Sequence, residues 1–87
     1  MKKLVSVTEV EDEGLIGLMG QTVTLMCGCY FYTGKLVGVN DTFVKLEQAR
    51  VVFETGPFNT KTWQDAQALP GDWYVQTASI ESFGILK

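Results

Sequence analysis

The chain has 87 residues, of which 46% are hydrophobic and 20% charged, and this composition describes a single small globular domain. Its apolar stretches fall well short of the about 18 residues that cross a membrane as a helix. The basic start, Met1-Lys2-Lys3, is followed by too short an apolar core for a signal peptide. We therefore expect a cytoplasmic protein that does not insert into membranes.

The chain contains no histidine and only two cysteines, Cys27 and Cys29. Two neighbouring thiols do not make a disulfide framework, and without histidine they cannot complete a structural zinc site. The commonest general base is also missing, and no nucleophile, base and orienting group stand at a readable spacing. We predict reduced cysteines, no metal or cofactor, and a protein that is not an enzyme.

A domain this short is marginally stable by itself, because it buries only about 60–65% of the surface of its unfolded chain. Small domains usually gain the missing stability from disulfides, from a metal or from assembly. Since the sequence argues against the first two, it favours self-assembly.

The net charge is −3 at pH 7, and most of the excess acid lies in the run from Glu9 to Glu13. The rest of the chain is nearly neutral and has no basic stripe of the kind that binds duplex DNA. Binding of a nucleic-acid single strand by stacking and local hydrogen bonds remains open.

The N-terminal segment, residues 1–14, is compatible with two structures. Thr8 and Glu11 have the spacing of a helix capping box, whereas Leu4 to Val10 also reads as a short strand. Glycines 14, 17 and 20 interrupt any helix that follows, at about 1 kcal/mol each relative to alanine.

Residues 20–55 have the two-residue period of β-strands. Val23 and Leu25 alternate with polar neighbours, as in a half-buried strand. Gly34 and Gly38 interrupt the next strand-like stretch, which is typical of a bulge or a sharp bend where a small sheet curls into a barrel.

One long strand is predicted from Phe43 to Thr55, after a turn at Asn40-Asp41. Val44 and Leu46 fall on one face of this strand, and we expect them to point into the core. The opposite face carries Phe43, Lys45 and Glu47.

Residues 56–72 form a long connection for so small a domain. Within it, Thr62 to Leu69 is predicted to add one short helical turn, with Trp63 packed over an end of the barrel. Two further strands follow in residues 73–85, with the corner at Ala78. The predicted fold is all-β, with or without one short N-terminal helix: five bent antiparallel strands in a small barrel of the OB, SH3 or Sm type.

Three stretches resemble the first motif of the Sm-like family, small bent β-barrels that form rings and bind RNA: Gly20 to Leu25, Tyr32 to Leu36 and Asp41 to Leu46. The corner from Val75 to Ile80 resembles the second motif, and the likeness extends over residues 15–85. It implies one domain over residues 1–87, whose copies join edge to edge, the fourth strand of one pairing with the fifth of the next.

The resemblance also implies a set of RNA-binding residues. Asp41 would orient its loop by hydrogen bonds, although Asn40 could equally fill the acidic position, and Phe43 would stack on a base. Lys45 stands where the family has asparagine, and it lacks an acceptor. Gln76 and Thr77 stand where the family has an arginine and a glycine.

The function predicted first is that of a non-catalytic homo-oligomeric ring that binds single-stranded RNA at its pore face. The alternative is an Sm-type ring without RNA binding that serves as a scaffold for protein partners. The acidic balance, the missing corner arginine, and a 56–72 loop that carries Phe58 and Trp63 favour this alternative.

Overall fold

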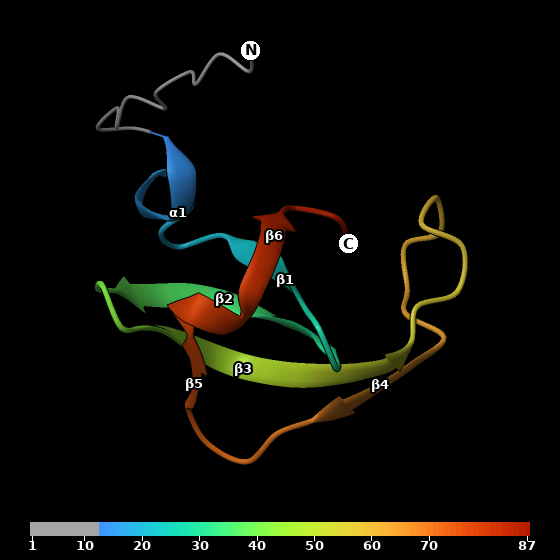
Figure 1. The fold of residues 1–87 in the computed structure, drawn as a ribbon. Helices are drawn as coiled ribbons and strands as arrows, with labels where there is room; N and C mark the ends of the chain where they lie inside the picture. The colour runs from blue at the N-terminus through green and yellow to red at the C-terminus, as the bar shows by residue number, and fades with distance from the viewer. Residues whose placement is uncertain (1–12) are drawn as a thin grey trace, which may run out of the picture.

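The structure, a computed structural model, describes residues 13–87, so the helix and strand alternatives for residues 4–11 lie outside the described part (Figure 1). None of the helices in this part is long and apolar enough to cross a membrane. One short helix and six strands follow in chain order: α1 (Gly14–Gly17), β1 (Thr22–Cys27), β2 (Phe31–Val39), β3 (Phe43–Glu54), β4 (Asp65–Ala68), β5 (Trp73–Gln76) and β6 (Ile80–Gly84), with the 3₁₀ turn η1 (Thr77–Ser79) between the last two.

All strand pairs are antiparallel, and the strand order is β4-β3-β2-β1-β6, with β5 also paired to β3. β5 pairs with the start of β3 and β4 with its end, so both lie along one edge of this long strand (Figure 1). The sheet bends around one core. The predicted all-β small barrel is confirmed.

The sheet bends at Gly34 and Gly38 of β2, as the sequence predicts. The register between β2 and β3 shifts on both sides of Leu36, between Thr33 and Lys35 and again before Gly38. A Cβ atom at Gly34 would lie only 3.1 Å from Ala49 Cα and from the Glu47 carbonyl oxygen. The absence of a side chain at Gly34 therefore allows β3 to cross β2 at close range.

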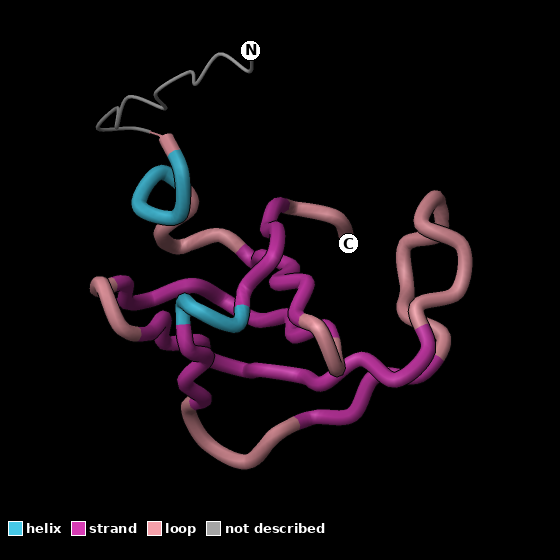
Figure 2. Tube along the Cα trace, in the orientation of Figure 1, coloured by secondary structure: helices cyan, strands magenta, loops and turns pink. Residues whose placement is uncertain are grey.

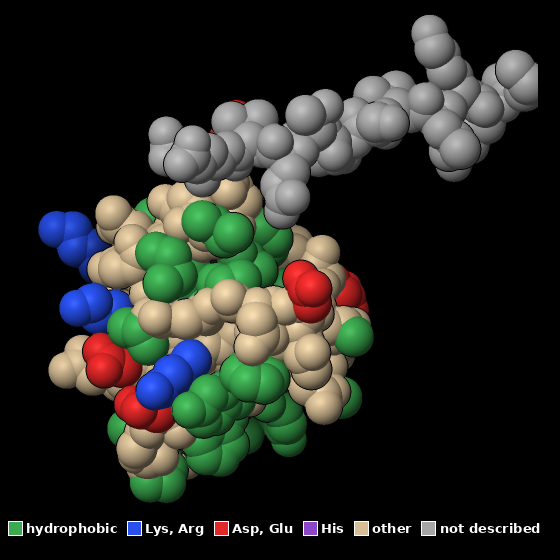
Figure 3. Space-filling model, turned by 90° about the vertical axis from the view of Figure 1, so that its left-hand side faces the viewer, with side chains coloured by type: hydrophobic (Ala, Val, Ile, Leu, Met, Phe, Trp, Pro, Cys, Tyr) green, Lys and Arg blue, Asp and Glu red, His purple; other side chains and the backbone are tan. Residues whose placement is uncertain are grey.

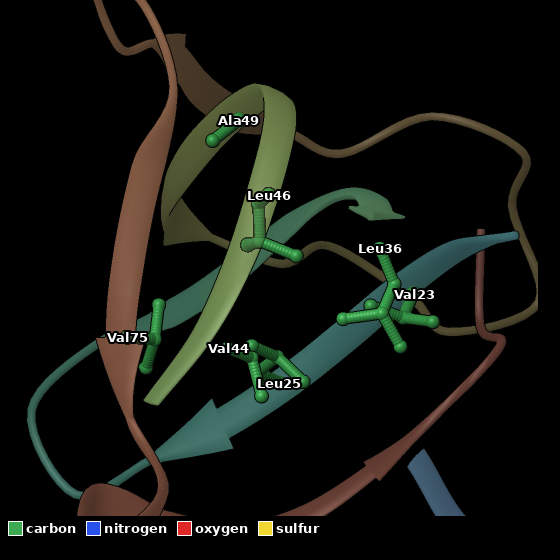
Figure 4. Close-up of a cluster of buried hydrophobic side chains, with 7 residues drawn as sticks. All are labelled: Val23, Leu25, Leu36, Val44, Leu46, Ala49 and Val75. Atoms are coloured by element: carbon green, nitrogen blue, oxygen red, sulfur yellow. The ribbon is translucent and has the colours of Figure 1, made fainter. Parts of the chain in front are cut away.

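The core lies between the inward faces of the strands (Figure 4). Val44 and Leu46 are fully buried, whereas Phe43 is 37% exposed, so the predicted alternation along β3 is confirmed. α1 is a single turn, and Leu15 within it and Leu18 directly after it pack against the core. The buried cluster consists of Val23, Leu25, Leu36, Val44, Leu46, Ala49 and Val75.

Two predictions about the second half of the chain are wrong. The segment from Thr62 to Leu69 forms no helical turn; its residues 65–68 are β4. The end of β3 offers unpaired backbone groups, and a short segment gains hydrogen bonds by pairing there. The corner is also longer than Ala78 alone, because η1 takes three residues (Figure 2).

Candidate functional site

The turn between β2 and β3 is held by the side chain of Asn40. Its Oδ1 accepts hydrogen bonds from the backbone N–H of Thr42 at 2.7 Å and of Phe43 at 2.9 Å. A short amide side chain reaches the backbone two and three residues ahead, which is the geometry of an Asx turn. Of the two candidates for orienting the loop, Asn40 rather than Asp41 therefore makes these bonds.

Thr77 connects this turn to the corner after β5. Its hydroxyl donates to the carbonyl oxygen of Asp41 at 2.8 Å, and its backbone N–H donates to the carbonyl oxygen of Thr42 at 2.9 Å. Phe43 and Gln76 are register partners. The fold thus brings the predicted site residues together at the start of β3 and the end of β5, and it engages the Thr77 hydroxyl in positioning the turn.

An exposed aromatic pair forms the centre of this face. The rings of Phe43 and Tyr74 are perpendicular, with centroids 5.2 Å apart, the edge-to-face arrangement that aromatic quadrupoles favour. Tyr74 is 53% exposed. Tyr74 is not among the residues predicted from the sequence, although the period of two along β5 places it on the same face as Gln76.

Lys45 lies beside the aromatic pair. Its Nζ is 5.8 Å from the centroid of the Tyr74 ring and 3.4 Å from Asp72 Oδ2. The hydrogen bond to Asp72, and then the charge interaction with Tyr74, raise the pKa of the Lys45 ammonium. Lys45 is therefore positive throughout the neutral range, and its ion pair is exposed, so an incoming anion can compete for it.

The face around Phe43 and Tyr74 combines the flat apolar surface of these rings with one cation, Lys45, and one side-chain amide, Gln76. Figure 3 shows the side of the molecule where β5 and the start of β3 lie, with hydrophobic side chains grouped beside basic and acidic ones. Such a surface can stack a planar ring, neutralise a phosphate and donate or accept a hydrogen bond. Within residues 13–87 no group of three or more His, Cys, Asp or Glu is placed to hold a metal ion.

A groove of about 520 Å³ adjoins this face. Both thiols line it, Cys27 from the end of β1 and Cys29 from the turn that follows, and both are free. Burial, and then the negative charge of Glu81, raise the pKa of the Cys27 thiol above its ordinary value. Cys29 is exposed.

We expect Cys29 to be alkylated before Cys27 at pH 8. The raised pKa of Cys27 lowers its thiolate fraction at any given pH, and the thiolate is the nucleophile. Peptide mapping of an iodoacetamide time course measures both rates, and the Cys27 rate should keep rising as the pH increases above 9. Equal rates at the two cysteines would contradict this assignment.

A search of protein-family models and of curated proteins finds no match to this chain. The resemblance to Sm-like proteins therefore rests on the motif residues of the sequence alone.

Proposed function

We propose that this protein is an Sm-like, non-catalytic ring that binds single-stranded RNA through the face around Phe43 and Tyr74. The observation that carries the proposal is the exposed perpendicular pair of Phe43 and Tyr74, with Lys45 beside it. Proteins that bind single strands combine positive charge for the backbone with exposed aromatic rings on which the bases stack.

Each group on this face has a role in binding a nucleotide. A base stacks on the outer surface of Phe43 or Tyr74, which is worth about 1–3 kcal/mol. Lys45 exchanges its exposed ion pair with Asp72 for the backbone phosphate. Gln76, the register partner of Phe43, offers both a donor and an acceptor to a base edge.

The arrangement of the sheet supports ring formation. Within residues 13–87, β5 pairs only with β3 and β6 only with β1. β5 and β6 are the fourth and fifth strands of the predicted barrel, and each leaves one edge unpaired. Strand edges of this kind invite pairing with another chain, and a closed ring satisfies all of them.

Replacing Phe43 by alanine tests the RNA site. We expect F43A to weaken binding of a labelled single-stranded oligonucleotide about tenfold, because one stacking surface is lost. The matched control is F53A: Phe53 is an exposed phenylalanine of the same strand, 47% exposed, which pairs instead with Tyr30. Titrations of oligo-U and oligo-A at two salt concentrations give the affinities, and native mass spectrometry gives the oligomeric state of each variant.

Equal losses in F43A and F53A would contradict the assigned face. A monomeric mass for the wild-type protein would overturn the ring while leaving RNA binding to be judged by the titrations. A shallow dependence of affinity on salt is expected, because stacking and hydrogen bonds release few counterions.

The protein-scaffold function is the second candidate, and the connection between β3 and β4 favours it. Phe58 is 52% exposed there, while Trp63 is only 9% exposed and so is not the contact residue. A ring that persists in native mass spectra but binds no oligonucleotide at low salt would favour this candidate over the first.

A further inference from the structure

A pocket of about 210 Å³ lies on a different part of the molecule, between the middle of β2 and β3 and the β3–β4 connection. Four of the seven lysines and arginines of the chain line it, whereas none of the Asp and Glu side chains of residues 13–87 does. This is unexpected in a chain of net charge −3. The lining residues are Thr22, Thr33, Gly34, Lys35, Gln48, Arg50, Lys61, Thr62, Trp63 and Lys87.

Lys87, one of the four cations, is bound within the wall of the pocket. Its ammonium group donates to the carbonyl oxygens of Thr55 and Pro57 at 2.9 Å and of Thr62 at 3.0 Å, and it lies 4.6 Å from the centroid of the Trp63 ring. An ammonium group has three N–H donors, so these carbonyls use all of them. Lys87 therefore holds the β3–β4 connection in place, and its positive charge adds to the positive potential of the pocket.

The other three cations keep donors for a ligand. Lys35 and Lys61 make no ion pair with any residue from 13 onward, and Glu47, the register partner of Lys35, does not line the pocket. Arg50 uses one N–H to reach the carbonyl oxygen of Ala66 at 3.0 Å. The rest of its five N–H groups remain available.

Thr33 provides an independent indication of a ligand. It is 4% exposed and lines the pocket, yet its hydroxyl has no hydrogen-bond partner among residues 13–87. Burying a hydroxyl without a partner costs about 1–3 kcal/mol, and buried polar groups in folded proteins are almost always paired. Thr33 is the register partner of Arg50, so a ligand oxygen that reached the covered hydroxyl would accept from both side chains.

We propose that this pocket binds a small ligand through a phosphate group. Several positive donors from different elements, with no Asp or Glu side chain of residues 13–87 in the lining, fit an anion that offers several acceptor oxygens. Guanidinium groups favour such tetrahedral oxyanions. The volume is below the about 300 Å³ at which pockets for drug-sized ligands begin. It therefore suits inorganic phosphate, pyrophosphate or the terminal phosphates of a small molecule rather than a whole nucleic-acid strand.

Two substitutions test the charge and the geometry of the pocket separately. In isothermal titrations with pyrophosphate at constant ionic strength, we expect R50Q to weaken binding at least tenfold, because a charge-assisted hydrogen bond is lost. We expect T33V, which changes no charge and keeps the side-chain shape, to weaken binding several-fold. The matched control is T24V: in the described part of the chain, Thr24 is the other buried threonine whose hydroxyl has no hydrogen-bond partner, and it does not line this pocket.

The outcomes are distinct. Selective weakening by R50Q and T33V, with T24V at the wild-type affinity, supports the pocket. The absence of pyrophosphate binding by the wild-type protein, or equal effects of T33V and T24V, overturns it. Inorganic phosphate and oligo-U complete the set of probes. If R50Q abolishes oligo-U binding while the wild-type protein binds neither pyrophosphate nor inorganic phosphate, the pocket belongs to the nucleic-acid surface and the small-ligand proposal is wrong.

Discussion

Replacement of Gly34 by valine is expected to destabilise the fold by about 3 kcal/mol, which is a large part of the about 5 kcal/mol that stabilises a small domain. A side chain at this position meets Ala49 Cα and the Glu47 carbonyl oxygen at 3.1 Å and Leu46 Cβ at 3.2 Å. Two of these neighbours belong to the backbone of β3 and cannot rotate away. The substitution therefore forces β2 and β3 apart where the sheet bends.

The matched control is valine at Gly38, in the same strand. A Cβ there meets only Lys45 Cβ, at 3.4 Å, which is ordinary contact, and valine is favoured in strands. Urea unfolding followed by tryptophan fluorescence measures both variants at one protein concentration. If G34V and G38V unfold at the same urea concentration, the close approach at Gly34 does not limit the fold.

The bend and the inner face of the barrel could be predicted from the sequence because both follow from local rules. Alternation along β3 assigns Val44 and Leu46 to the core, since successive side chains point to opposite faces. Gly34 indicates the bend because only a residue without a Cβ permits so close an approach of β3. Neither inference requires knowing which segments meet in space.

The features that were missed depend on tertiary pairing. β4 has no strand-like pattern of its own, and it forms because the end of β3 has an unpaired edge. Tyr74 belongs to the site because β5 pairs with the start of β3. The choice between Asn40 and Asp41 depended on the geometry of one turn, which no periodicity reveals.

The basic pocket could not be recognised in the sequence for the same reason. Lys35, Arg50 and Lys61 are separated along the chain by stretches with no shared motif, and they meet only because β2, β3 and the β3–β4 connection converge. The near-zero net charge of the rest of the domain also gives no indication of a local excess of positive charge.

Leu46→Ala is expected to lower the free energy of unfolding by about 2–5 kcal/mol, the usual result of removing a fully buried leucine. Leu46 is completely buried, lies in the core cluster and is the register partner of Trp73. The cavity left behind is bounded by β1, β2 and β5, whose other core side chains cannot all move in to fill it. Equilibrium urea unfolding at one protein concentration measures the loss.

The same strand provides the control for this prediction. Phe43, three residues earlier, points to the opposite face, and its edge-to-face contact with Tyr74 is worth only about 1 kcal/mol. We therefore expect L46A to reduce stability severely while the protein that remains folded keeps its oligonucleotide affinity. We expect F43A to weaken oligonucleotide binding while the stability changes little. If both variants lose stability and affinity in the same proportion, the inner and outer faces of β3 do not separate folding from binding, and the face around Phe43 is part of the core.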